Sequence, residues 1–148
     1  MGTGSHWPRP DMDPWLFALN LAWEVAQLPL YALDRYAGWP ALAFAVLHCT
    51  FGDAAMAFAS YVIAALATGT PRWPLQRPLA GLAVVLIAGE LFTIWAEWNN
   101  VYVLRNWAYA AGMPTIGGIG LAPLAQWIML PVAALMIVRN RRRPPVDT

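Results

Sequence analysis

The sequence predicts an all-α integral membrane protein, a bundle of four membrane-spanning helices with both termini in the cytoplasm. Hydrophobic residues make up 59% of its 148 residues and charged residues only 11%, whereas an ordinary soluble domain is about a quarter charged. Apolar segments long enough to cross a bilayer recur four times along the chain. The arginines are also divided unevenly between the segments that join these helices. We therefore interpret residues 1–148 as one transmembrane domain.

The first helix is expected over residues 14–33. Asp13 and Pro14 make a good start, because Asp caps the first backbone N–H groups and Pro suits the first helical position. The segment lacks a basic leader and a small-residue cleavage site, so it is interpreted as a retained span rather than a signal peptide. Pro29 should kink it. Its polar side chains are spaced by three or four residues and so share one face: Asn20, Glu24 and Gln27.

The second and third helices are expected over residues 40–67 and 79–99, separated by a loop with three prolines. The second helix carries His48, Cys49 and Asp53 in an otherwise apolar interior. The third helix places its polar residues at positions i, i+3 and i+7, which lie on one helix face: Glu90, Thr93 and Glu97.

A structured connection follows the third helix, with a short interfacial helix expected over about 101–111. Its tyrosines, tryptophan and arginine are residue types favoured at headgroup depth. The fourth helix is expected over residues 116–138. It begins among three glycines that would allow close helix approach, and it carries Gln126 and Trp127 near its middle.

The distribution of arginine predicts the orientation. With four spans, the N-terminus, the loop at 69–78 and the C-terminus lie on one side, which holds seven of the nine arginines. The other side holds Arg35 and Arg105. Because cytoplasmic loops carry the excess of positive residues, the sequence predicts a multi-pass protein of the plasma membrane, the bacterial inner membrane, with the N- and C-termini cytoplasmic.

Polar side chains from all four helices are expected at a similar depth. A rise of about 1.5 Å per residue places them near the middle of a hydrocarbon core of about 30 Å. A charged group there costs roughly 2.5–3.5 kcal/mol, so these groups should converge on one another or on a cavity. A hydrogen-bond network that only joins the helices is the structural alternative, although such contacts average about 0.6 kcal/mol. The layer consists of Glu24, His48, Asp53, Glu90 and Gln126.

Acid–base chemistry is the function that this layer favours. At least one buried carboxyl should be protonated at neutral pH, because burial and like charges disfavour ionisation. Glu90 and His48 are the candidate proton-transfer pair, with Asp53 and Glu24 orienting them. Indole faces stabilise cations, so protonation of a lipid-soluble alkene by an isomerase or cyclase fits this pattern. The candidate substrate-binding residues are Trp23, Gln27, Trp95, Glu97, Trp98, Asn100, Gln126 and Trp127.

Two other classes remain open. A small proton-coupled transporter or channel would use midplane carboxylates and helices interrupted at Pro29 and Pro131, and with so few helices it would work as a homo-oligomer. A non-catalytic subunit of a membrane complex would use the polar layer only for assembly. Whether the protein is an enzyme therefore stays open at this point.

Some sites and partners are not expected. One interior histidine without a Glu-x-x-His pair falls short of the di-iron pattern, so no metal and no cofactor are predicted. The chain has no lysine for a Schiff base, which excludes a retinal-type pigment. The expected partners are membrane lipid and an apolar small-molecule substrate, and no nucleic acid.

Several motifs resemble small bacterial membrane proteins that have no assigned activity. They are Trp23-Glu24-x-x-Gln27-x-Pro29, Gly52-Asp53, Trp107-Ala108-Tyr109-x-x-x-Met113-Pro114 and the segment 118–131. The architecture is also similar to that of the emopamil-binding (EXPERA) group, which includes sterol isomerases that use a histidine, carboxylates and a tryptophan. The order along the chain of His48 with Asp53, then Glu90, then Gln126-Trp127 carries this likeness. The resemblance implies intramembrane isomerase chemistry.

Overall fold

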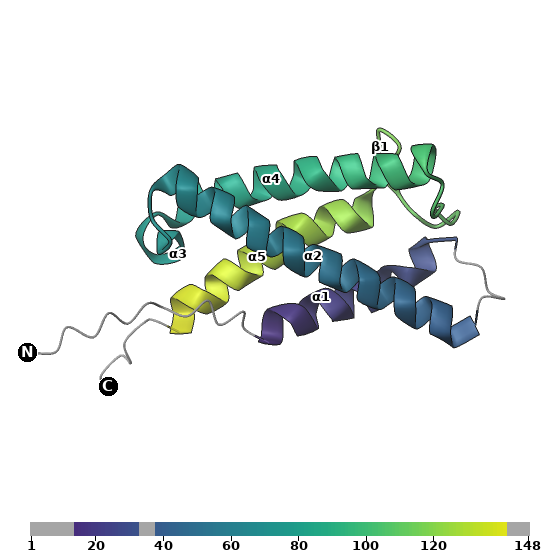
Figure 1. Cartoon of the computed structure of the whole chain (residues 1–148), viewed down its shortest axis with the longest axis horizontal. Helices are drawn as coiled ribbons and strands as arrows, with labels where there is room; N and C mark the ends of the chain where they lie inside the picture. The colour runs from purple at the N-terminus through teal and green to yellow at the C-terminus, as the bar shows by residue number, and fades with distance from the viewer. Residues whose placement is uncertain (1–13, 33–37, 142–148) are drawn as a thin grey trace, which may run out of the picture.

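The computed structural model describes residues 14–32 and 38–141 and is mostly helical (Figure 1). Three segments are long and apolar enough to cross a membrane: Gly38–Thr68, Pro78–Val103 and Leu121–Arg141. The elements in chain order are α1 (Pro14–Gln27), the 3-10 turn η1 (Leu28–Leu30), α2 (Gly38–Thr68), α3 (Trp73–Gln76), α4 (Pro78–Trp98), the π-helical turn η2 (Asn99–Val103), β1 (Thr115–Ile116), β2 (Ile119–Gly120) and α5 (Leu121–Arg141).

The first helix is shorter than the expected 14–33, because α1 ends at Gln27. Pro29 has no N–H for the helix, and it disfavours helical backbone at the residue before it. After the η1 turn the chain is extended and pairs with the loop that follows η2. The Ala32 N–H donates to the Ala108 carbonyl (2.8 Å), and the Ala110 N–H donates to the Leu30 carbonyl (2.9 Å). The backbone groups that the broken helix leaves free are therefore partly satisfied by this loop.

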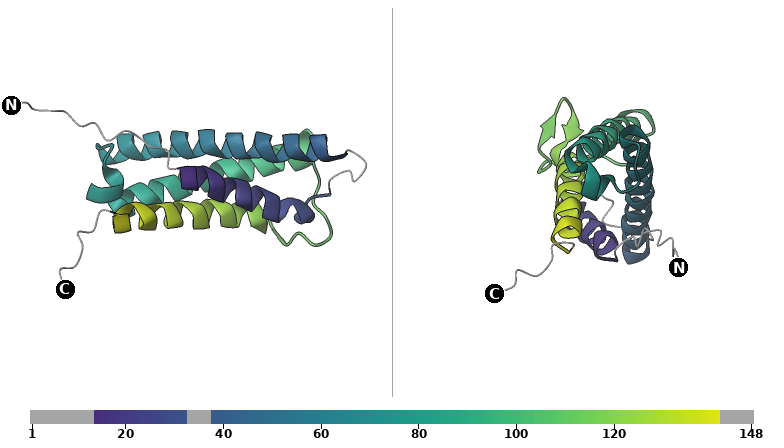
Figure 2. Two further views of the ribbon diagram at one scale, coloured as in Figure 1. Left: turned by 90° about the horizontal axis from the view of Figure 1, so that it is seen from below. Right: turned by 90° about the vertical axis from the view of Figure 1, so that its left-hand side faces the viewer.

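Four helices pack side by side (Figure 2). Helix α4 packs on α2 and α5, and α1 packs on the same two neighbours from the other side. Helix α1 covers only the half of the assembly that lies far from α3 (Figure 2). At the other end α3 takes its place, packing against α2, α4 and α5. The two halves of the molecule are thus filled by different segments.

Close approach of the helices depends on two glycines of α4. The indole of Trp73, which is buried in a cluster with Ala64, Val85 and Leu135, lies where a Cβ on Gly81 would be. The indole of Trp127 on α5 lies against Gly89 in the same way. Each tryptophan therefore packs directly on the backbone of α4.

The segment before α5 differs from the expected interfacial helix at 101–111 and from the expected helix start at 116. Residues 104–114 form a loop, and 115–120 form a two-stranded hairpin that pairs Thr115 with Gly120. Gly117 and Gly118 have φ values of +57° and +84°, which permit the tight reversal. The Tyr102 hydroxyl donates to the Gly118 carbonyl (2.6 Å) and holds the hairpin against η2.

Substitution of the two packed glycines should destabilise the fold. A methyl group on Gly81 or Gly89 would overlap a rigid indole, so Gly81→Ala and Gly89→Ala should each lower the unfolding free energy by about 1–3 kcal/mol. Gly52→Ala is the matched control, because no atom lies within 4 Å of its added Cβ and alanine favours a helix. Thermal unfolding in lipid nanodiscs measures the effect. Equal midpoints for Gly89→Ala and Gly52→Ala would contradict this packing.

Candidate functional site

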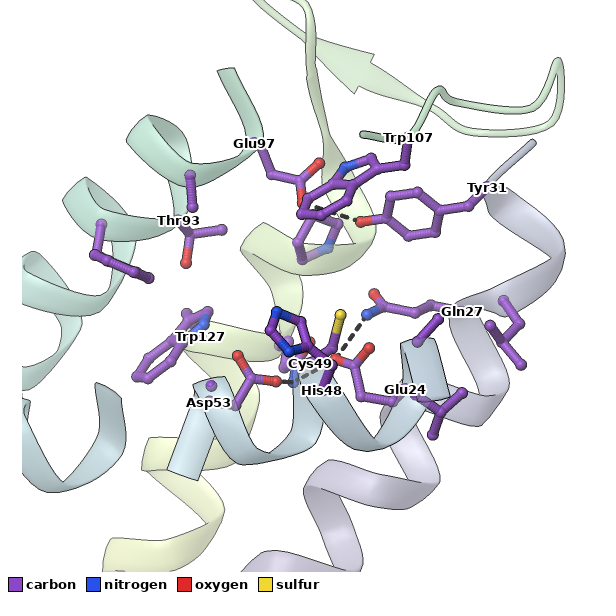
Figure 3. A pocket seen from close by; sticks show the side chains of 18 residues that line it. Glu24, Gln27, Tyr31, His48, Cys49, Asp53, Thr93, Glu97, Trp107 and Trp127 are labelled. Atoms are coloured by element: carbon purple, nitrogen blue, oxygen red, sulfur yellow. Dashed lines mark hydrogen bonds between the residues drawn. The ribbon is translucent and has the colours of Figure 1, made fainter. Parts of the chain in front are cut away.

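A cavity of about 270 Å³ lies between α1, α2, α4 and α5 (Figure 3). Apolar and aromatic side chains form much of its wall, including Phe92 and Trp127 of the helices and Trp107 of the loop after η2. Its polar lining comes from all four helices: Glu24, Gln27, His48, Asp53, Glu97 and Gln126. Four of the five residues of the expected polar layer therefore line one cavity: Glu24, His48, Asp53 and Gln126.

The Gln126 side chain joins three helices at one end of the cavity. Its Nε2 lies 2.7 Å from Asp53 Oδ2, 3.2 Å from Glu24 Oε1 and 3.2 Å from Asn20 Oδ1. A second amide, Gln27 Nε2, donates to the same Glu24 oxygen (2.9 Å). An amide group has only two hydrogens to donate, so the three acceptors compete for them. Two carboxyl groups from α1 and α2 are thus held next to one donor on α5.

Glu97 lies at the other end of the cavity, and two phenols hold it. The Tyr109 hydroxyl donates to Glu97 Oε2 (2.6 Å), and the Tyr31 hydroxyl donates to Oε1 (3.2 Å). The oxygen of Tyr109 also accepts the Gly120 N–H (2.9 Å). Burial, with the adjacent Glu97 carboxylate, raises the pKa of both tyrosines above the usual value for a phenol. Both side chains therefore remain hydrogen-bond donors at neutral pH.

The exposed residues of the cavity lining are His48 and Gly52 of α2 and Phe92 of α4. The mouth of the cavity therefore lies between these two helices, which diverge away from α3 (Figure 1). The Phe44 ring stacks on the His48 ring, with centroids 5.8 Å apart. The mouth thus lies beside exposed apolar side chains along the helices rather than at their ends.

Three buried polar atoms on side chains of the cavity wall have no hydrogen-bond partner among the described residues. They are Gln27 Oε1, Thr93 Oγ1 and Trp107 Nε1. An unpaired buried polar group costs about 1–3 kcal/mol. The wall therefore suits a molecule that brings at least one polar group to a mostly apolar space.

Of the four residues predicted to be catalytic, the structure brings Glu24, His48 and Asp53 to the cavity, but Glu90 does not line it. Buried positions on α4 recur every four residues, at Gly81, Val85, Gly89, Thr93 and Glu97. Gly89 therefore faces the centre at that depth, and Glu90 lies about 100° further around the helix. The expected Glu90–His48 pair is thus not formed around this cavity.

The residues predicted to bind substrate also divide into two groups. Gln27, Glu97, Gln126 and Trp127 line the cavity. The others do not: Trp95 and Trp98 are 56% and 51% exposed, Trp23 lies elsewhere on α1, and Asn100 bonds to the Ala96 carbonyl and to Asn106. Trp95 and Trp98 lie outside the row of buried positions that runs along α4 from Gly81 to Glu97. The composition of this helix does not indicate which of its faces is buried.

The loop after η2 brings residues to the site that the sequence does not predict there. Trp107, which lines the cavity, and Tyr109, which bonds to Glu97, belong to the segment expected to be an interfacial helix. Tyr31 falls within the helix expected over 14–33, although Pro29 indicates that this helix ends before Tyr31. No local sequence pattern indicates that residues 108–110 pair with residues 30–32.

The described residues also limit the kinds of site. Among them, no group of three or more histidine, cysteine, aspartate or glutamate side chains is placed to hold a metal ion. Glu24 and Asp53, which lie together, are bound to amides instead.

Comparison with known proteins gives no match, because no family model, curated protein or solved structure is similar enough to the chain. The function must therefore be inferred from the chemistry of the cavity.

The two tyrosines that bind Glu97 should ionise only at very alkaline pH. Their raised pKa values mean that the folded state holds protons that the unfolded state releases near pH 10. This contribution to stability is complete below about pH 10 and is lost as the pH rises further. A tyrosinate absorbance titration should show a late step that coincides with unfolding. That step should shrink in the Tyr31→Phe/Tyr109→Phe variant.

Tyr102→Phe is the matched control, since the Tyr102 hydroxyl bonds to a backbone carbonyl and not to Glu97. This variant should keep the late step. Ionisation of all tyrosines in a single step near pH 10 in the folded protein would contradict the assignment.

Proposed function

We propose that the protein is an intramembrane acid–base enzyme, of the isomerase or cyclase type, acting on an isoprenoid or another apolar lipid. The observation that carries this proposal is the cavity, where three carboxyl groups and an imidazole surround one mostly apolar space. Acid and base groups placed within reach of one bound molecule are what proton transfer requires. The aromatic walls suit a reaction in which positive charge develops on carbon.

The size of the cavity limits what can enter it. About 270 Å³ corresponds to the volume of roughly nine water molecules, slightly below the usual range of small-molecule pockets. One double bond and its neighbouring carbons fit inside. The rest of a long lipid would extend through the mouth between α2 and α4.

The surroundings of the mouth support entry from the bilayer. Exposed aromatic side chains border it on both helices: Phe44, which stacks on His48 of α2, and Phe92 with its neighbour Trp95 on α4. His48 is exposed among them. A molecule dissolved in the hydrocarbon core could thus reach the carboxyl groups without crossing the headgroup layer.

In this proposal Glu24 and Asp53 supply the proton, and His48 acts at the mouth. Both carboxyl groups are within hydrogen-bond reach of Gln126 Nε2. Trp107 and Trp127 supply aromatic walls of the cavity. Glu90 has no catalytic role, because it lies outside the cavity lining.

We also propose that the four packed helices form a membrane bundle with both termini cytoplasmic, in the plasma membrane, the bacterial inner membrane. Arg72 and Arg77 flank α3, and Arg139 and Arg141 lie in the last turn of α5. These segments lie at the same end of the molecule (Figure 2), whereas Arg105 belongs to the loop at the other end. Such a bias favours the cytoplasm for the α3 end.

Cysteine labelling tests this orientation. In a Cys49→Ala background, Gly112→Cys should react with a membrane-impermeant maleimide on intact spheroplasts, because Gly112 lies in the exposed outer loop. Pro71→Cys, in the exposed turn before α3, should react only after the membrane is permeabilised. The reverse labelling pattern would contradict the orientation.

Proton-coupled transport by a homo-oligomer is the second candidate. The observation in its favour is that polar groups extend from Asp53 and Glu24 at one end of the cavity to Glu97 near the loop. Carboxyl groups in such a row are typical of proton pathways. Proteoliposomes with an internal pH indicator test it, and a proton flux that Asp53→Asn abolishes would favour transport over catalysis.

Removal of the carboxyl group of either Glu24 or Asp53 should strongly lower the acid–base activity. Protein in liposomes that contain a panel of isoprenoid lipids is incubated in D2O, and mass spectrometry measures deuterium at carbon. Asp53→Asn and Glu24→Gln should lower the incorporation rate about 10²–10⁴-fold, the usual contribution of a general acid or base. Glu90→Gln is the matched control and should stay near the wild-type rate.

Absence of deuterium incorporation in the wild type would overturn the enzyme proposal for these lipids. Equal rates in all variants would overturn the assigned residues.

A further inference from the structure

We infer that Glu97 is the catalytic base of the cavity, ionised and held by two tyrosines, while Glu24 and Asp53 share one proton and form the acid. This inference rests on the proposed acid–base function and assigns opposite roles to carboxyl groups at the two ends of one space. The assignment follows from the direction of each hydrogen bond.

The hydrogen bonds of Glu97 favour an ionised carboxylate. Each of its oxygens accepts a phenol, Oε2 from Tyr109 and Oε1 from Tyr31. The Tyr109 oxygen also accepts the Gly120 N–H, and its own hydrogen is directed to Glu97. The Tyr109–Glu97 distance of 2.6 Å is that of an O–H donor on a charged oxygen, about 2.5–2.7 Å. Two donors thus stabilise the charge on a side chain that is only 6% exposed.

The hydrogen bonds around Glu24 and Asp53 favour a pair of carboxyl groups that carries one negative charge in total. Both carboxyl groups approach one nitrogen, Gln126 Nε2, and Asn20 competes for the same two hydrogens. No arginine is found among the described residues that line the cavity. Two carboxylates this close cannot both be ionised in a water-poor site, so they hold one proton between them.

The two centres face the same space from different directions. Figure 3 shows Glu97 near Trp107 and Tyr31 at one end, with Glu24 and Asp53 near His48 and Cys49 at the other. A molecule in the cavity would lie between the acid and the base. One carbon could therefore gain a proton while a different carbon loses one.

This arrangement determines which bonds form and break in the reaction and where the proton goes. The π electrons of a substrate double bond form a new C–H bond with the proton of the Glu24–Asp53 pair, which leaves a cation on the neighbouring carbon. Either directly, or after another double bond of the substrate attacks that cation to close a ring, a C–H bond next to the cation breaks. Its electrons form the new double bond, and its proton passes to Glu97. Return of that proton to the pair completes the cycle, so the product is an isomer of the substrate and no oxidant or reductant is needed.

Infrared spectroscopy of the whole protein in lipid, without substrate, tests the assignment. A protonated carboxyl group absorbs at a carbonyl frequency separate from those of amides and carboxylates. At neutral pH the wild type should show such a band from the Glu24–Asp53 pair. Asp53→Asn should change or abolish this band, and Glu97→Gln should leave it intact. Loss of the band in Glu97→Gln would overturn the inference.

A second variant keeps the test independent of misfolding. The Tyr31→Phe/Tyr109→Phe protein removes both donors to Glu97 without changing any carboxyl group, so Glu97 should take up a proton and add a carbonyl band. Tyr102→Phe is the matched control and should add none, since its hydroxyl bonds to the Gly118 carbonyl. An unchanged spectrum in the double variant would show that the tyrosines do not hold Glu97 ionised and would also overturn the inference.

The deuterium experiment separates this inference from the proposed function. Incorporation that is lost in Asp53→Asn and retained in Glu97→Gln would overturn the role of Glu97 as the base while the enzyme proposal stands. Absence of incorporation in every protein, with the infrared assignment intact, would instead overturn the enzyme proposal. Loss of incorporation in both variants, with the infrared bands assigned as above, supports both conclusions.

Discussion

The structure depends on keeping three carboxyl groups inside an apolar assembly of helices. Each would cost roughly 2.5–3.5 kcal/mol as an isolated charge in a bilayer, so each needs a partner from another segment. Gln126 is this partner for Glu24 and Asp53, because its amide nitrogen lies within hydrogen-bond distance of both. In doing so it joins α1, α2 and α5 at one point. On the fourth helix, α4, the partners of Glu97 are Tyr31 and Tyr109, which lie outside the helices.

Packing on α4 places these partners at the right depth. Gly81 and Gly89 let the indoles of Trp73 and Trp127 lie on the helix backbone, which fixes α4 against α3 and α5. Helix α1 is too short to fill the whole length, and α3 fills the end that it does not reach. The cavity lies in the half that contains α1, where α2 and α4 diverge.

The loop between η2 and α5 makes the two ends of the cavity chemically different. Tyr109 and Trp107 belong to this loop, and the backbone bonds between 30–32 and 108–110 hold it beside Tyr31. Phenols that donate to Glu97 stabilise its charge, whereas Glu24 and Asp53 approach the same Gln126 nitrogen and compete with Asn20 for its two hydrogens. The loop thus converts a set of similar carboxyl groups into a candidate base and a candidate acid.

The sequence by itself determined the helical class, the long apolar spans and the presence of a polar layer, because length, hydropathy and three- or four-residue spacing are local properties. It also indicated Glu24, His48, Asp53 and Gln126 as members of one site, since their similar depth follows from the helical rise. The rotation of α4 was decided only by tertiary packing. The two glycines turn that helix so that Gly89 and Glu97 face the centre, and Glu90 does not. The arrival of Tyr31, Trp107 and Tyr109 beside Glu97 was likewise decided by pairing between distant segments. Spacing along a single helix cannot encode such pairing, because it depends on where another part of the chain can satisfy its backbone and side-chain hydrogen bonds.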